Sequence, residues 1–176
     1  MDKKVVLLTC CYFFIFSFRM EADINDTSII SVNVVNLELG GTGLLYSVNY
    51  ERVFLQKTAY FLSVRVGFGS YSTMEKQQYT VPVEINTLQP VSRQNHYLEW
   101  GLGTTYVQEQ SRNAYAMLLA SGRVGYRFQQ DIAGFFFKIS YTPLFPCWAD
   151  KIFSYKFIHY AGISIGYTFN CCKCFC

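Results

Sequence analysis

Two histidines, His96 and His159, are the candidates for acid–base catalysis near neutral pH. A hydrolase or acyltransferase needs a nucleophile, a base and an orienting group within hydrogen-bonding reach. Asp150 and Ser154 precede His159, but their spacing matches no recognisable catalytic motif. The two histidines begin predicted strands at opposite ends of the sheet, so they cannot share one site. We therefore predict that the chain is not an enzyme, with a lipid-modifying enzyme that uses His159 as the alternative.

Cysteines are the candidate metal ligands, and four of the seven crowd the C-terminus. These four are Cys171, Cys172, Cys174 and Cys176. Paired cysteines of zinc sites are usually separated by about two to four residues, whereas consecutive cysteines of the tail are separated by at most one. We expect the tail to be an incidental extension, with soft-metal binding or disulfide formation as alternatives. No metal and no cofactor are predicted.

Eight charged residues within the apolar-rich segments of the chain form a set of four acids and four bases, which we call the balanced set. They are Glu38, Glu51, Arg65, Glu84, Glu99, Arg123, Arg127 and Lys138. Isolated charges are costly to bury, whereas opposite charges in a confined space neutralise one another. Such a set requires structural elements that carry all of its members to one surface.

Strands are the elements that the sequence predicts for this purpose. Eight segments are rich in Val, Ile, Tyr, Phe and Thr and are separated by turn residues. The predicted strands are about 32–39, 43–54, 59–70, 78–88, 96–107, 115–128, 134–145 and 159–169. None has a sustained helical period, so no helix is predicted after the N-terminal segment.

Residue types alternate along these strands, whose successive side chains point to opposite faces. One face is small and polar, and all eight charges of the balanced set fall on it. Arg52 falls on the other face, near a strand end. That face is apolar, and its predicted lipid-facing residues are Tyr60, Leu62, Val64, Val66, Leu98, Trp100, Leu102, Phe135, Phe137, Ile139, Ile163, Ile165, Tyr167 and Phe169.

This pattern reverses that of a soluble β-sandwich, in which apolar faces point inward and charges meet water. A membrane barrel has lipid outside and a polar interior. A barrel of about eight strands encloses a space that side chains just fill. We therefore predict an all-β fold, an eight-stranded antiparallel up-and-down transmembrane β-barrel with the charges as a network in its lumen. A soluble, ligand-holding barrel is the alternative.

The composition and the N-terminus agree with export to a membrane. The chain has 176 residues, 51% hydrophobic and 15% charged, which fits one folded domain and excludes intrinsic disorder. A net charge of +3 is too weak to indicate a nucleic-acid partner. Lys3 and Lys4 precede an apolar run from Val5 to Phe18, which is the layout of a signal peptide. The predicted parts are a signal peptide (1–22), an N-terminal periplasmic segment (23–31), the barrel (32–169) and a Cys-rich tail (170–176).

Connection lengths predict the orientation of the barrel. Apart from a tight turn at 40–43, the longer connections, 70–78, 108–114 and 145–159, fall at one end. Outer-membrane barrels have short periplasmic turns and longer outer loops. Both termini are therefore expected in the periplasm and the long connections outside.

Several segments carry a family resemblance. They are Glu38-Leu39-Gly40-Gly41-Thr42-Gly43 with residues 46–52, and residues 122–127, 134–138 with 142–145, and 162–169. They resemble a group of small outer-membrane β-barrel proteins best known from the Bacteroidota. The resemblance implies the same fold, a location in the cell outer membrane, and contact with outer-membrane lipid and the barrel-assembly machinery. That machinery reads a terminal aromatic residue, and here Phe169 is followed by the Cys-rich tail.

The family resemblance offers no catalytic residue to transfer to this chain. The favoured role is structural or surface-interacting, with outer loops that face an unidentified partner. A small channel or a hydrophobic-ligand-binding barrel is the first alternative, and the lipid-modifying enzyme is the second.

Overall fold

The protein is described by a computed structural model that covers residues 32–57, 59–74, 76–91, 95–110, 114–129, 134–149 and 157–170. The predicted signal peptide and the N-terminal periplasmic segment lie outside the described residues. The Cys-rich tail also lies outside them, apart from Asn170.

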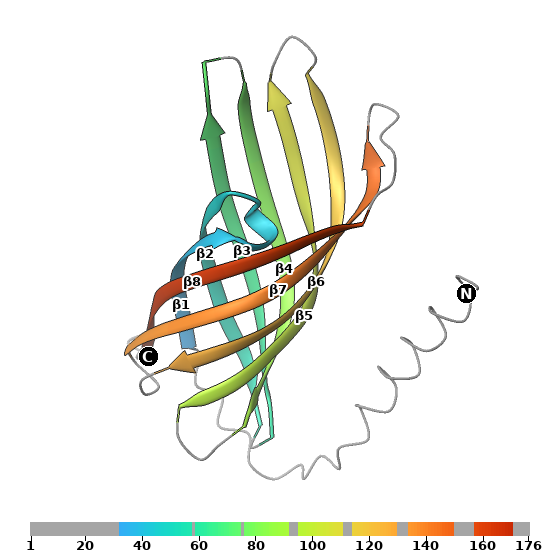
Figure 1. The fold of residues 1–176 in the computed structure, drawn as a ribbon. Helices are drawn as coiled ribbons and strands as arrows, with labels where there is room; N and C mark the ends of the chain where they lie inside the picture. Colours follow the sequence, from blue (N-terminus) through green and yellow to red (C-terminus); the bar gives the residue numbers. More distant parts are fainter. Residues whose placement is uncertain are drawn as a thin grey trace, which may run out of the picture.

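Eight strands form a closed barrel in which each strand pairs antiparallel with its neighbour in the chain, and the last pairs with the first (Figure 1). The strands are β1 (Val32–Gly40), β2 (Tyr46–Gln56), β3 (Phe61–Ser72), β4 (Gln77–Pro90), β5 (His96–Gln110), β6 (Tyr115–Gln129), β7 (Gly134–Ala149) and β8 (Ile158–Asn170). The predicted fold class is confirmed. No helix among the described residues is long and apolar enough to cross a membrane.

The connection between β1 and β2 differs from the prediction. The sequence predicts a strand from residue 43, but Gly41–Gly43 form one 3-10 turn, η1, and β2 begins at Tyr46. The backbone φ is 75° at Gly40 and 67° at Gly41, a region that glycine enters without steric cost. A Cβ atom at Gly41 would also collide with the carboxyl group of Glu38. These glycines let the turn fold into the barrel, where all three of its residues are buried.

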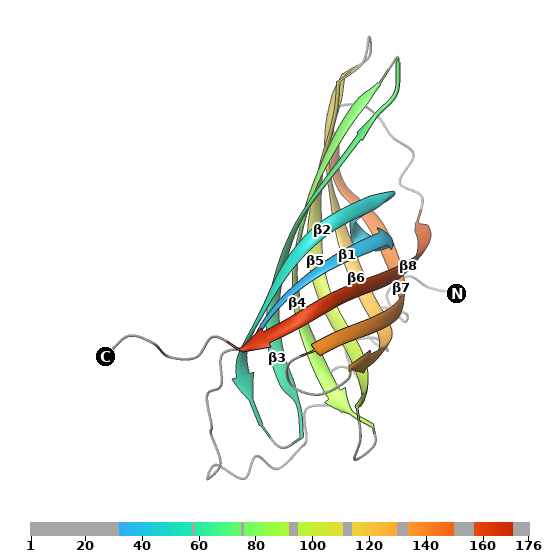
Figure 2. The same cartoon turned by 90° about the vertical axis from the view of Figure 1, so that its left-hand side faces the viewer.

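The two ends of the barrel differ in height (Figures 1 and 2). We call the end where β1 begins and β8 ends the terminal end. At the opposite, raised end, the β3–β4 and β5–β6 hairpins stand well above the β1–β2 turn. β3 pairs with β2 only as far as Phe68, and β7 pairs with β8 only as far as Leu144. Beyond these points β3 to β7 continue as a raised sheet with two open edges.

The raised sheet corrects the prediction of long loops. The β3–β4 and β5–β6 links are only four residues each, 73–76 and 111–114, because residues expected in loops are paired strands. Residues 145–149, also expected in a loop, belong to β7. Polar residues such as Gln77 and Gln110 suggest loops on polarity alone. In the strands Gln77 is half-buried and Gln110 is exposed, so both polar side chains fit on the raised sheet.

Candidate functional site

The lumen gathers the chemistry-bearing residues of the barrel. All eight members of the balanced set are buried, with no more than 2% of any residue exposed. They come from seven strands, and only β6 supplies two of them, Arg123 and Arg127. Arg52, which has the opposite phase, is exposed on the exterior. The alternation along the strands thus separates the lumen charges from the exterior.

Four of the charges form one cluster, which we call the central cluster: Glu38, Arg65, Glu84 and Arg123. Arg123 donates from Nη1 to Glu38 Oε1 at 2.7 Å and from Nη2 to Glu84 Oε1 at 3.2 Å. Arg65 Nη2 lies 3.2 Å from Glu38 Oε2 and also contacts Glu84. Each carboxylate therefore meets both guanidinium groups, an arrangement that offsets the cost of burying four charges.

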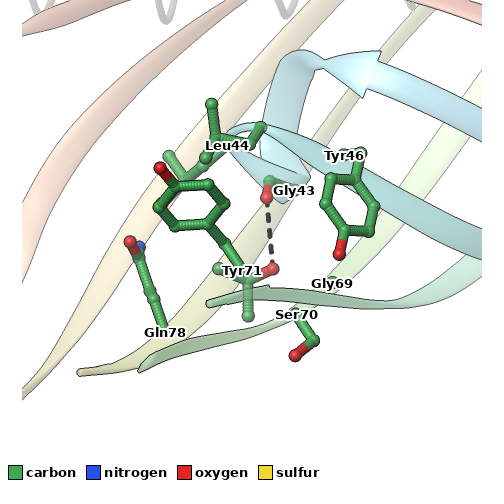
Figure 3. Close-up of a pocket in the computed structure, with 9 residues that line it drawn as sticks. Gly43, Leu44, Tyr46, Gly69, Ser70, Tyr71 and Gln78 are labelled. Atoms are coloured by element: carbon green, nitrogen blue, oxygen red, sulfur yellow. Dashed lines mark hydrogen bonds between the residues drawn. The ribbon is translucent and has the colours of Figure 1, made fainter. Parts of the chain in front are cut away.

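The η1 turn is part of the central cluster. Arg65 and Arg123 donate to Thr42 Oγ1 at 3.0 and 3.2 Å. The turn is also bonded to the barrel wall, because Thr80 Oγ1 donates to the carbonyl oxygen of Gly43 at 3.1 Å (dashed line in Figure 3). The β1–β2 turn thus serves as a plug inside the lumen. Sequence reasoning missed Thr42 because a turn residue has no strand phase.

The other four charges form two separate pairs. Lys138 Nζ lies 2.8 Å from Glu99 Oε1. Arg127 Nη1 lies 3.3 Å from both carboxylate oxygens of Glu51, and its guanidinium carbon lies 4.0 Å from the ring centroid of Phe136. Each lumen base therefore contacts at least one lumen acid.

Apolar layers lie on both sides of the charges. Toward the raised end, Val107, Leu119 and Leu144 are fully buried, and Leu44, Met117 and Tyr160 pack against them. Toward the terminal end, Val32, Val34, Val53 and Phe136 are buried, and Phe61 packs against them. We call these groups the raised layer and the terminal layer.

Sequence reasoning missed both apolar layers, although a signal was present. Leu119 lies four residues before Arg123, and Val107 lies eight residues after Glu99, so both share the inward phase of the charges. An apolar residue at a strand position that points inward, like the charges, would have predicted these layers.

The exterior is apolar on every strand. One exposed residue from each strand, 44–59% exposed, illustrates this: Leu37, Val48, Val66, Ile85, Leu102, Val124, Ile139 and Ile163. Of the residues predicted to face lipid, Tyr60, Leu62 and Trp100 are half-buried, and the other eleven are exposed. A continuous apolar exterior of this extent is unusual for a monomer in water.

The two histidines do not come together. His96, at the start of β5, bonds to the Tyr126 hydroxyl at the terminal end. His159, near the start of β8, bonds to the Tyr141 hydroxyl at the raised end. Ser154 and Asp150 lie outside the described residues. Within the described ranges, no three His, Cys, Asp or Glu residues are grouped to hold a metal ion.

Comparison with known proteins points to the fold alone. No family model matches the sequence, and no curated protein matches it. The N-terminal β-barrel domain of OprF from Pseudomonas aeruginosa superposes with a TM-score of 0.57 and 11% identity, covering 82% of this chain and 100% of that one. Neisserial surface protein A superposes with a TM-score of 0.51 and 8% identity, covering 82% of this chain and 98% of that one.

The chain has the fold of small outer-membrane β-barrels. Both comparison chains are matched over nearly their whole length, so the likeness concerns the complete barrel. At identities of 11% and 8%, the likeness extends to the fold alone. The lumen and the raised sheet are therefore interpreted from this chain's own residues.

Proposed function

We propose that this chain is an outer-membrane β-barrel with a closed lumen, whose raised sheet serves as a surface for interaction outside the cell. The observation that carries the proposal is the separation of residues by strand phase. Every strand presents apolar side chains outward, and eight paired charges lie inside. Lipid wets the outer face of such a barrel at little cost, whereas water would not.

The layers in the lumen favour a closed barrel over a channel. An ion path needs a continuous run of polar groups or water, because charges in an apolar medium are costly. Here the raised layer and the terminal layer lie on either side of the paired charges, and η1 lies among the charges. The charges bond to one another and to Thr42, which suits a brace for the barrel wall.

The raised sheet favours a surface-interaction role. Ser70–Ser72 pair with β4 alone, and Phe145–Ala149 pair with β6 alone. Strand edges of this kind present backbone N–H and C=O groups to which an extended segment of another protein can pair. Tyr71 is 40% exposed beside one edge, and Trp148 is 51% exposed beside the other. Aromatic residues of this kind are enriched at protein interfaces.

The orientation and the assembly route are part of the proposal. The raised end faces outward, and the terminal end lies in the periplasm. Phe169, exposed near the end of β8, is the residue proposed for recognition by the barrel-assembly machinery. The proposed kinship with the Bacteroidota barrels rests on the sequence motifs alone, among them Gly40–Gly43, which forms the inward turn of this chain. A solved member of that group with a strand continuing through this turn would contradict the kinship.

Cell fractionation with epitope insertion tests the location and orientation. One epitope is inserted after Met74, in the β3–β4 link, and a matched epitope is inserted after Lys57, in the β2–β3 link. The protein should fractionate with outer membranes and migrate differently on gels before and after heating. Intact cells should bind antibody at the Met74 insertion and not at the Lys57 insertion. Recovery of native protein as a soluble periplasmic monomer would overturn the proposal.

A further inference from the structure

Arg52 of β2 places a charge on the otherwise apolar exterior of the barrel. Its neighbours Glu51 and Val53 are buried in the lumen, whereas Arg52 points outward and is exposed. Its guanidinium group makes no hydrogen bond or ion pair with the residues that the structure describes. A charge on the lipid-facing side is costly at the bilayer midplane and costs little near the membrane interfaces. The depth of Arg52 along the barrel therefore decides what it can bind.

Strand pairing places Arg52 near the terminal end. Arg52 pairs with Asn33 of β1, and Asn33 pairs on its other side with Phe169 of β8. Asn33 is the second residue of β1, and Phe169 is the last but one of β8. Residues opposite each other in an antiparallel pair lie on the same face. Arg52 thus lies on the exterior where β1 begins and β8 ends, at the depth expected for lipid headgroups.

Two further polar groups lie beside Arg52 on the exterior. Asn33 has the outward phase of Val35, yet it is only 6% exposed, and the Tyr50 hydroxyl donates to its Oδ1 atom at 2.6 Å. We call Asn33, Tyr50 and Arg52 the exterior polar patch. Toward the raised end, the same two strands present an apolar strip that includes the paired residues Leu37 and Val48, 44% and 56% exposed. A polar patch next to an apolar strip matches the headgroup and the chains of a lipid.

The charges indicate that the headgroup is an anion. Among the described residues, the carboxylates pair elsewhere: four lie in the lumen, and Glu109 meets Lys76 at the raised end. A second cation, Lys57, follows β2 at the terminal end, with its Nζ atom 5.7 Å from the ring centroid of Tyr60. Guanidinium groups bind phosphate oxygens through two parallel N–H bonds. Arg52 therefore suits a phosphate group in a region where the described charges are positive.

We propose that the exterior polar patch binds an anionic glycerophospholipid, whose phosphate meets Arg52 and whose acyl chain lies along Leu37 and Val48. The chain runs from the terminal end toward the raised end, so the lipid belongs to the leaflet that surrounds the terminal end. Its assignment to the periplasmic leaflet rests on the proposed function, whereas the binding itself requires only a barrel in a membrane.

The test uses the full chain folded in nonionic detergent micelles, with dioleoylphosphatidylglycerol as the probe and native mass spectrometry as the measure of binding. Arg52→Gln should weaken this binding by about tenfold or more. Arg52→Lys should weaken it less, because lysine keeps the charge and loses the paired donors. Lys76→Gln removes a charge at the raised end and should leave the binding unchanged. Heat-dependent gel mobility reports separately whether each variant folds.

Two ligand controls identify what Arg52 recognises. Dioleoylglycerol, which has the same chains and no phosphate, should bind more weakly than the phospholipid. Inorganic phosphate, which has no chains, should not displace the phospholipid at equal concentration. Equal binding of the phospholipid to the wild type and Arg52→Gln would overturn the proposal. So would an equal loss in Lys76→Gln, dioleoylglycerol binding as tight as that of the phospholipid, or displacement by inorganic phosphate.

Photocrosslinking locates the bound chain. A phosphatidylglycerol with a diazirine in its acyl chain should crosslink to peptides that contain Leu37 or Val48. Leu102, an equally exposed residue of β5, serves as the control position. Crosslinks that favour Leu102 would contradict the site on β1 and β2. Antibody binding to an epitope after Lys57 on intact cells would instead overturn the orientation, and with it only the choice of leaflet.

Discussion

The two ends of the lumen are built from the same residue types but packed differently. Toward the raised end, the centre of the apolar layer is fully buried, and in the central cluster each of two carboxylates meets both Arg65 and Arg123. Toward the terminal end, Arg127 has one acidic partner, Glu51, and the apolar layer borders a cavity of about 100 Å³. A shared cluster braces the barrel wall at several points, whereas a single ion pair beside a cavity braces it at one.

The largest effect that this comparison predicts comes from Glu38→Gln. The change leaves Arg65 and Arg123 with Glu84 as their remaining carboxylate, and breaking a buried ion pair costs about 3–5 kcal/mol. Glu51→Gln should lower the free energy of unfolding by less, because Glu51 contacts one guanidinium group, whereas Glu38 contacts two. Urea unfolding in detergent, followed by gel mobility, measures both variants. Equal unfolding midpoints would remove the distinction between the two ends.

Apolar truncation should show the same contrast. Leu119→Ala opens a void in the raised layer and should cost about 3 kcal/mol, as large-to-small changes in well-packed cores do. Val53→Ala enlarges a cavity that already exists, so its cost should be clearly smaller. Both variants are compared by the same urea unfolding experiment. A larger loss for Val53→Ala would show that the terminal layer is the better packed one.

The plug turn gives a smaller and more specific effect. Thr42→Val keeps the side-chain shape but removes the oxygen that accepts from Arg65 and Arg123. Hydrogen bonds to charged groups contribute about 2 kcal/mol, so the variant should be destabilised by about that amount. Thr42→Ser keeps the hydroxyl and serves as the matched control. If the Val and Ser variants have the same urea unfolding midpoint, the hydroxyl does not hold the plug.

The smallest effect is expected outside the lumen. Lys76 Nζ lies 3.7 Å from Glu109 Oε1, and the lysine side chain is 59% exposed. The Glu109 side chain is only 10% exposed, but the lysine ammonium stays in water, and ion pairs with such a partner contribute about 1 kcal/mol or less and are screened by salt. Lys76→Gln should therefore leave the unfolding midpoint almost unchanged, and raising the salt concentration should reduce any difference further. A loss comparable to that of Glu38→Gln would mean that the raised sheet supports the barrel.

Strand phase made the barrel predictable from the sequence. With a period of two, Arg65 and Val64 must point to opposite faces, so the placement of charges revealed which side of the sheet is apolar. The strand number and order followed from the turn residues between segments. The strand lengths did not, because polarity alone does not separate a loop from a strand such as β5, which continues to Gln110. Glu109 lies on this extension, although the sequence suggested a loop there.

The pairing of the charges could not be read from the sequence. Phase places Glu38 and Arg123 on one face, but 85 residues separate them in the chain. Their contact depends on the closure of the barrel and on the shear of its strands. The inward turn was also missed, since a Gly-rich segment after a strand indicates a turn without its direction. The collision that a side chain at Gly41 would make with Glu38 becomes visible only in three dimensions.

The closed lumen is the central claim, and ion conductance tests it most directly. Purified protein is reconstituted into planar bilayers, and the current is recorded with the wild type and with Glu99→Gln, whose native carboxylate contacts Lys138. The layered lumen predicts no steady conductance for the wild type. A steady wild-type conductance that changes in size or ion selectivity with Glu99→Gln would show that ions pass the charges, and would contradict the account.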